Sequence, residues 1–377
     1  MNKIPLNIVG LDGGGFIIKK GGGSSGGGGG NAGSDMPVIG DGKTYLYITI
    51  ANEFTMDIPL SFRGQDYKEV IIDWGDGTME SYQSVNPETA THKYGALGDY
   101  VISLSMSEGG TLELGGNSSR NIFEESNINS LTSVLKHVEI GKNTIIKTCA
   151  FMKCASLKSV AMPHGVIEWG ARSLSYCYSL SSIEIPEGVT SVPSEVFNYC
   201  SSLVSVKLPT SITSIASYAF YNCYSLSSIE IPEGVTSVGS GAFSSCFVLH
   251  SVKLPKNITK LAERTFYSCY SLSSIEIPEG VTSLEAYVFG ECDTLASVKF
   301  PKDVTSVGSR VCYGCYDMVA YDFSDHLSVP SLGSTDALPN GSVVVPDALY
   351  DEWIAASNWS SLASRIIKKS DWDASQS

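Results

Sequence analysis

The sequence of 377 residues lacks the features that would connect it to a membrane or an export route. It has no apolar run of about 18 residues, so no membrane-spanning helix is expected. Near the start, Asn7, Gly10 and Asp12 interrupt the apolar stretch, so a secretory signal is not expected either. No cysteine precedes Cys149, which leaves no site for lipoprotein acylation before the folded part.

Positive charge and catalytic motifs are also scarce. Lys and Arg number 25 against 39 Asp and Glu, so the formal net charge is −14 and the pI is about 4.8. Because an acidic surface repels phosphates, we do not expect nucleic acid as a partner. The sequence shows no nucleophile elbow, no paired-carboxylate signature and no second cysteine pair for a zinc site. We therefore expect a protein that is not an enzyme and that holds no metal or cofactor.

Glycine is concentrated in one place. Residues 21–30 read GGGSSGGGGG, a composition typical of a flexible tether because glycine loses much entropy on ordering. We interpret residues 1–20 as an N-terminal anchoring peptide and residues 21–42 as a Gly-rich linker. An artificial tag remnant is the alternative explanation of the glycine run.

Residues 43–108 alternate apolar and polar side chains in short runs that Gly and Asp interrupt, which is typical of a small β-sandwich. The stretch 72–78 reads IDWGDGT and is followed by HKY at 92–94 and GDYV at 98–101. This combination resembles the PKD domain, an immunoglobulin-like sandwich. The resemblance implies spacing, adhesion or protein contact rather than catalysis. Residues 109–130 are expected to be a connector.

Two aspartates in the PKD-like stretch have two interpretations. Asp73 and Asp76 are candidate calcium ligands. Asp76-Gly77 is also the sequence of a tight turn, and this second interpretation is the simpler one.

Residues 131–323 repeat with a period of 23 residues. Eight cysteines mark the period: Cys154, Cys177, Cys200, Cys223, Cys246, Cys269, Cys292 and Cys315. Columns of Leu, Phe and Pro keep the same spacing, and a fixed period of this length predicts a solenoid. In one turn, Ile229 and Ile231 alternate as on a strand, and Ala242, Phe243 and Cys246 suit one helical turn.

The frame L-x-x-I-x-I-P-x-x-V-x-x-I-x-x-x-A-F-x-x-C resembles the BspA-like class of leucine-rich repeats. The resemblance covers about 190 residues. It implies adhesion and protein binding, and it brings no catalytic residues.

A second period of 46 residues lies within the first, because SSIEIPEGVTS recurs at 181–191, 227–237 and 273–283. The outward strand position therefore alternates in charge along a strand-face charge ladder: Glu184, Lys207, Glu230, Lys253, Glu276, Lys299 and Asp322. Neighbouring strands lie about 4.8 Å apart, so each charge has opposite neighbours. We interpret this face as scaffolding, with a role in ligand recognition as the alternative.

Aromatic residues gather on the other side of each turn, at and beside the position after the cysteine. We call them the aromatic ridge: Tyr176, Tyr178, Tyr199, Tyr221, Tyr224, Phe247, Tyr267, Tyr270, Tyr313 and Tyr316. Tyrosine offers rigid, amphipathic contact area, so the ridge is the candidate surface for a protein or glycan. The alternative is that these rings only stack on one another along the solenoid.

The cysteines suggest no disulfide or metal. Column cysteines point the same way from stacked turns, which is poor disulfide geometry, and a free cysteine behaves as a small buried apolar residue. Cys312 and Cys315 form a C-x-x-C pattern, but the Phe and Cys columns already account for both.

Residues 324–377 are expected to cap the open end of the solenoid. Asp347 is a suitable N-cap for a helix that follows it, and a second short helix is expected over 361–368. The pattern V-P-x-x-x-Y-x-x-W-x-x-x-x-x-W resembles the tails of leucine-rich-repeat proteins of gut bacteria and their prophages. Trp353 and Trp359 are expected to cover the last coil, with a docking patch as the alternative.

The expected fold is mainly β with short helical turns: a leucine-rich-repeat solenoid after an immunoglobulin-like sandwich, closed by a small helical cap. Three functions fit it. The first is a phage virion protein, a fibre or fibre-tip adhesin that attaches through its N-terminal peptide and binds a host-surface protein or glycan. The second is a bacterial cell-surface adhesin, and the third is an intracellular protein-binding scaffold. A homo-oligomer is compatible with each of them.

Overall fold

The structure is a computed structural model. It describes residues 6–10, 16–20, 41–51, 57–65, 68–83, 88–107, 110–115, 121–123, 134–163, 166 and 168–377. The chain divides into two compact units, Met1–Pro186 and Glu187–Ser377. The glycine run and much of the expected connector lie outside the described residues. The domain boundaries inferred from the sequence stay predictions.

The first unit begins with an antiparallel hairpin of β1 (Leu6–Gly10) and β2 (Phe16–Lys20). Two larger sheets follow, with strand orders β12-β10-β3-β8-β5-β6 and β13-β11-β9-β4-β7. Their strands are β3 (Thr44–Ile50), β4 (Asp57–Gly64), β5 (Glu69–Asp73), β6 (Met79–Gln83), β7 (Glu88–Lys93), β8 (Gly98–Met106), β9 (Leu112–Leu114), β10 (Leu135–Glu139), β11 (Thr144–Ile146), β12 (Ser159–Ala161) and β13 (Glu168–Trp169). Alternation buries one face of β5, at Val70 and Ile72, whereas β9 and β11 are buried along their whole length.

The first strands of the repeat continue both of these sheets. Strand β10 pairs antiparallel with β3 and parallel with β12, while β11 pairs parallel with β9 and β13. The first repeat turn therefore has no open strand edge toward the N-terminal sheets, which serve as its cap.

The residues of the PKD-like pattern form one cluster. Trp74 is fully buried and stacks on His92, with ring centroids 4.8 Å apart. The Tyr94 hydroxyl donates to the Trp74 carbonyl at 2.8 Å. Gly75 has a φ of +79°, and a side chain there would meet the Val101 carbonyl at 2.4 Å, so the turn requires glycine. The immunoglobulin-like and PKD-like assignments stay predictions.

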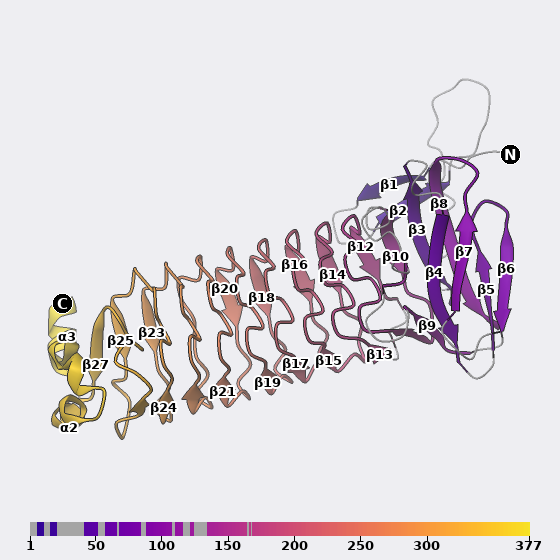
Figure 1. Ribbon diagram of the computed structural model, residues 1–377. Coiled ribbons are helices and arrows are strands. Elements are labelled where there is room, and N and C mark those ends of the chain that lie inside the picture. Colours follow the sequence, from indigo (N-terminus) through magenta and orange to yellow (C-terminus); the bar gives the residue numbers. More distant parts are fainter. Residues whose placement is uncertain are drawn as a thin grey trace. The chain divides into compact units, whose positions relative to one another are not determined.

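The second unit is a stack of repeat turns followed by a cap (Figure 1). Two-residue strands pair in parallel as β15-β17-β19 and β21-β22-β24-β26, and longer strands pair as β18-β20 and β23-β25-β27-β28. The last strand of the first unit is β14 (Ser182–Glu184). The strands of the second unit before its final strand are β15 (Ser191–Val192), β16 (Ser205–Lys207), β17 (Ser214–Ile215), β18 (Ser228–Glu230), β19 (Ser237–Val238), β20 (Ser251–Lys253), β21 (Lys260–Leu261), β22 (Ser283–Leu284), β23 (Ser297–Lys299), β24 (Ser306–Val307), β25 (Ala320–Asp322), β26 (Ser331–Leu332) and β27 (Ser342–Val345). No strand forms at Ser274–Glu276, the corresponding row between β20 and β23.

The segment around the Phe and Cys positions turns the chain, but its hydrogen bonds are not those of the helical turn that the sequence predicts. The Phe197 amide donates to the Ala219 carbonyl of the next turn at 2.9 Å, whereas the Cys200 amide donates to Phe197 of its own turn at 3.0 Å. Glu195 and Tyr199 have left-handed φ values of 55° and 59°, and these two positions are left-handed in the other described turns as well. A helix would keep its amides within one turn, whereas this alternation links successive turns and satisfies buried backbone groups.

Apolar columns fill the interior of the second unit. Successive phenylalanine rings stack, as in Phe220–Phe243 with centroids 5.3 Å apart and planes within 3°. The leucine column is fully buried at positions such as Leu226 and Leu249. All ten cysteines of the chain are buried free thiols. The core columns inferred from the period are confirmed.

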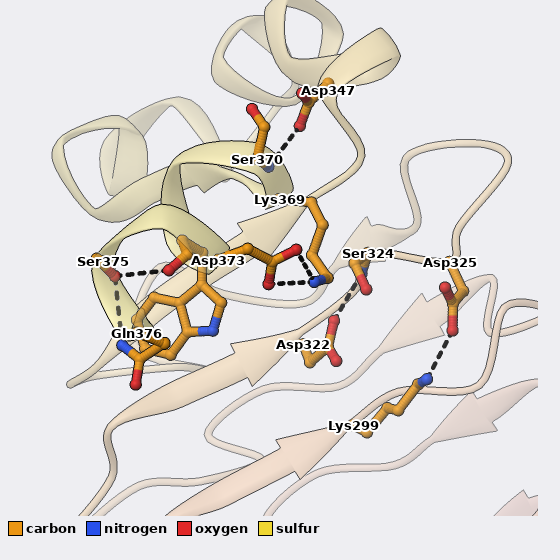
Figure 2. A network of polar contacts seen from close by, with 11 residues as sticks. Lys299, Asp322, Ser324, Asp325, Asp347, Lys369, Ser370, Asp373, Ser375 and Gln376 are labelled. Atoms are coloured by element: carbon orange, nitrogen blue, oxygen red, sulfur yellow. Dashed lines mark hydrogen bonds and ion pairs between the residues drawn. The ribbon is translucent and has the colours of Figure 1, made fainter.

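The C-terminal cap consists of η4 (Asp347–Leu349), α2 (Tyr350–Ala355), η5 (Ser360–Arg365), β28 (Ile366–Lys368) and α3 (Lys369–Gln376). The expected short helix over 361–368 is confirmed in part: a 3-10 helix covers its first residues, up to Arg365, but Ile366–Lys368 form strand β28. Asp347 does not cap the helix that follows it. Instead its carboxylate accepts the Ser370 amide in the first turn of α3 at 3.0 Å (Figure 2).

Trp353 and Trp359 are buried against the last coil, as expected. Their rings lie 5.1 and 5.4 Å from that of Phe323. Among the described residues, no helix has the length and apolar character needed to cross a membrane.

Candidate functional site

In the second unit, the aromatic side chains at and near the position after each column cysteine form two clusters. The first contains Tyr199, Tyr218, Tyr221, Tyr224, Phe247 and Tyr270, joined by ring contacts. Tyr224 stacks on Phe247 at 4.7 Å, and Phe247 stacks on Tyr270 at 4.9 Å. Tyr218 and Tyr270 remain 39% and 38% exposed. The rings therefore stack along the solenoid and face solvent at the same time.

The second cluster combines aromatic rings with arginines. Arg264 and Arg310 lie over the Tyr287 ring at 4.9 and 5.7 Å, and Tyr287 also contacts the edges of Tyr267 and Tyr313. Arg310 donates to the Asp336 carboxylate at 2.6 Å and to the Tyr287 hydroxyl. These contacts hold the guanidinium in one orientation on the surface.

The chemistry of this second cluster is acidic as well as aromatic. Burial and a hydrogen bond with Glu291 raise the pKa of Tyr267 to about 12, so its hydroxyl stays protonated. Asp336 has a lowered pKa because Ser334 and Arg310 donate to it. The cluster thus offers hydroxyl donors and charges held in place by their partners.

The remaining ridge residues are divided between the two units. Tyr176 and Tyr178 belong to the first unit, where their rings meet edge to face at 6.1 Å. In the second unit, Tyr313 and Tyr316 are the most exposed aromatics of the ridge, at 46% and 74%.

The strand-face charge ladder is only partly paired as expected. Lys253 and Glu230 form an ion pair at 2.8 Å with both side chains largely exposed. Lys299 instead pairs with Asp325 at 2.6 Å, while Asp322 accepts the Ser324 amide at 2.9 Å (Figure 2). Exposed pairs of this kind contribute little to stability, because solvent screens their charges.

The two candidate calcium ligands are engaged within their own turn. Asp73 accepts the Gly75 amide at 2.9 Å, and Asp76 accepts the Thr78 amide at 3.0 Å and contacts His92 at 2.8 Å. These bonds support the tight-turn interpretation. Across the part of the chain that the structure describes, no cluster of three or more His, Cys, Asp or Glu side chains is arranged to hold a metal ion.

Some members of the surface were missed in the sequence. Tyr218, Arg264, Tyr287 and Arg310 share one column at intervals of 23 or 46 residues, so the period contained their signal. The period also contains a second charged column, which the sequence analysis did not identify. It consists of Glu233, Lys256, Glu279, Lys302 and Asp325, three residues after the first.

Comparison with known proteins agrees with the repeat. The BspA type leucine rich repeat region, in six copies, matches residues 119–246 and 213–333. A crystal structure of a leucine-rich repeat protein from Bacteroides ovatus is similar, with 25% identity and a TM-score of 0.50, covering 63% of this chain and 68% of that chain. No protein of curated function matches.

Two further solved structures are also similar to parts of the chain, with lower TM-scores. A leucine-rich repeat protein from T. pallidum is 27% identical, with a TM-score of 0.38, and covers 48% of this chain and 83% of that chain. A leucine rich cell surface protein from Faecalibacterium prausnitzii is 21% identical, with a TM-score of 0.26, and covers 56% of this chain and 90% of that chain.

The matched family consists of repeats that typically serve as binding scaffolds, and no catalytic family is indicated. The matched segments together span more than half of the sequence. The chain therefore belongs to the BspA-type leucine-rich-repeat family.

Proposed function

We propose that the chain is an adhesin, a non-enzymatic protein that binds a macromolecule on a cell surface through its aromatic ridge. The observation that carries the proposal is the exposure of large aromatic side chains along one side of a regular solenoid, from Tyr218 to Tyr316. Exposed aromatic patches with polar surroundings are typical of recognition surfaces.

The ring geometry favours a protein as the ligand. Phe247 has a ring stacked on each of its faces, so neither face is free to receive a sugar ring. Arg310 is likewise occupied by Asp336 and Tyr287. What the ridge offers is ring edges, hydroxyls and fixed charges, a combination that suits the mixed polar and apolar surface of a protein.

The proposal is tested with the labelled chain titrated on intact gut bacteria and on immobilised mucin. One variant combines Tyr218→Ser with Tyr270→Ser, and another combines Tyr313→Ser with Tyr316→Ser. At least one variant is expected to weaken binding by about tenfold or more, because buried aromatic anchors dominate interfaces. The control is Val204→Ser, which removes an apolar side chain that is 50% exposed beside the strand face. If both ridge variants bind as the control does, the proposal is wrong.

The place where the adhesin acts is part of the proposal. A phage particle is the first hypothesis, the bacterial cell surface is the second, and an intracellular scaffold is the third. Mass spectrometry of particle, envelope and cytosolic fractions separates them. Recovery in purified particles at fixed stoichiometry supports the virion, whereas recovery in the envelope without the particles supports the cell-surface adhesin. Recovery in the cytosol alone contradicts both adhesin locations.

A further inference from the structure

The strand face of the second unit carries two charged columns. The first contains Lys207, Glu230, Lys253, Glu276, Lys299 and Asp322. Three residues further along each turn, the second contains Thr210, Glu233, Lys256, Glu279, Lys302 and Asp325. All of these residues are exposed except Asp322, which is half-buried.

The two columns change sign together. The turn of Glu230 carries Glu233, and the next turn carries Lys253 and Lys256. From Glu230 to Asp325 the two columns therefore form a band of one sign in each turn, whereas the turn of Lys207 has only one of these charges, because position 210 is Thr. With turns about 4.8 Å apart, bands of the same sign recur roughly every 9.6 Å. Ion pairs between neighbouring turns explain why the charges alternate in sign along one column. They do not require both columns to have the same sign in each turn.

Several contacts show how these charges are used within the chain. Glu233 accepts the Lys256 amide of the next turn at 3.1 Å, and Glu230 pairs with Lys253. Both side chains of the Glu230–Lys253 pair nevertheless remain more than 60% exposed. Beside the first column lies a column of exposed serines, at positions such as Ser228 and Ser251, whose small side chains leave room for close approach.

We propose that this banded face binds a second copy of this chain, antiparallel, in a two-fold symmetric dimer. The order of signs from Lys207 to Asp322 is +, −, +, −, +, −, and reversing it gives the opposite sign at each row. A two-fold axis between the rows of Lys253 and Glu276 places Lys253 opposite Glu276 of the second copy. The same axis places Glu230 opposite Lys299 and Lys207 opposite Asp322. A two-fold interface of this kind is self-complementary by construction.

The size of the face indicates a weak, salt-sensitive dimer. Six rows at about 4.8 Å and five or six residues of strand and turn at about 3.3 Å give roughly 500 Å² on each copy. Both copies together then bury about 1,000 Å², the lower limit for a specific interface. A slip by one row places like charges together, so the bands determine the register.

The dimer is tested by sedimentation velocity of the full chain over a range of concentrations, at about 50 mM and about 500 mM salt. Screening is expected to raise the dissociation constant about tenfold or more between the two. Lys253→Glu places like charges opposite each other at two symmetric contacts, so it is expected to weaken the dimer about tenfold at low salt.

The decisive variant combines Lys253→Glu with Glu276→Lys. Across the proposed interface this exchange restores opposite charges, so the dimer is expected to return. Within one copy it places like charges next to Glu230 and Lys299, so pairing within the face becomes worse. Far-ultraviolet circular dichroism confirms that each variant is folded.

The Tyr313→Ser and Tyr316→Ser variant serves as a control and should dimerise normally. A chain that is monomeric at low salt, a dimer unaffected by Lys253→Glu, or a double variant that stays monomeric while folded would each overturn the proposal.

Discussion

The thiol of Cys246 donates a hydrogen bond to the carbonyl oxygen of Phe220, in the preceding turn, at 3.3 Å. The same bond, 26 residues back along the chain, is made by Cys177, Cys223, Cys269, Cys292 and Cys315. The Phe220 carbonyl also accepts the Cys223 amide at 3.2 Å. The cysteine therefore fills a small apolar space and supplies a donor to the second lone pair of a buried carbonyl.

Replacing this thiol should separate its two roles. Cys246→Ala loses both volume and donor and should lower the free energy of unfolding by about 1–2 kcal/mol. Cys246→Ser loses similar volume but keeps a donor, so it should cost less than the alanine variant. Urea unfolding followed by circular dichroism measures both. A serine variant that is less stable than the alanine variant would contradict the role of the thiol as a donor.

Thiol reactivity should report folding of the solenoid. All ten thiols are buried, and burial raises the pKa of the Cys223 and Cys269 thiols. Because the thiolate is the reactive form, a thiol-specific colorimetric reagent should react very slowly with the native chain and with all ten cysteines in urea. Rapid reaction of several thiols without denaturant would contradict the buried cysteine column.

A buried carboxyl group should make the first unit sensitive to pH. Burial, with the nearby Asp41 charge, raises the pKa of Glu139 to about 7. The folded form therefore holds this proton more tightly than the unfolded chain, whose glutamates titrate near pH 4.3. The resulting stability is present at low pH and is lost as the pH rises through about 7.

Thermal unfolding of the native chain and of Glu139→Gln, compared between about pH 4.5 and pH 8, measures this loss, most of which falls below about pH 7. His137 has its pKa lowered to about 4 by burial, so it destabilises the fold only as the pH falls below about 6.5. The Glu139→Gln variant should lack the part of the decline, between about pH 4.5 and pH 7, that this carboxyl group causes. A decline of equal size in that variant would assign the effect to another group.

The two cap tryptophans should differ when each is replaced by phenylalanine. The Trp359 indole donates to the Pro330 carbonyl at 2.7 Å, whereas the buried Trp353 indole nitrogen has no hydrogen-bond partner. Trp359→Phe leaves a buried carbonyl without its donor and should cost about 1–2 kcal/mol more than Trp353→Phe. Chemical denaturation of both variants provides the comparison, and equal costs would mean that the Pro330 bond contributes nothing.

Much of the solenoid was predictable because every turn repeats the same pattern of buried and exposed positions. The period of 23 residues identified the buried Phe, Leu and Cys columns, and the structure confirms them. The period also marked the column of Arg264, Tyr287 and Arg310, although this column was not recognised in the sequence. The ridge residues could be identified in the sequence because they alternate with core positions. Whether their rings stack on each other depends on side-chain torsion angles, which the spacing of residues does not determine.

By itself, the sequence determined the repeat, its core columns, the alternating charges and the two tryptophans that cover the last coil. Periodicity is enough for these features because stacking places identical positions one above another. Only the tertiary structure decided the left-handed turns, the pairing of Lys299 with Asp325, the bond from Ser370 to Asp347 and the sheets that β10 and β11 share with the N-terminal strands. Each of these depends on a backbone group or charge finding a partner on another turn or element, and the choice among such partners is made by packing in three dimensions.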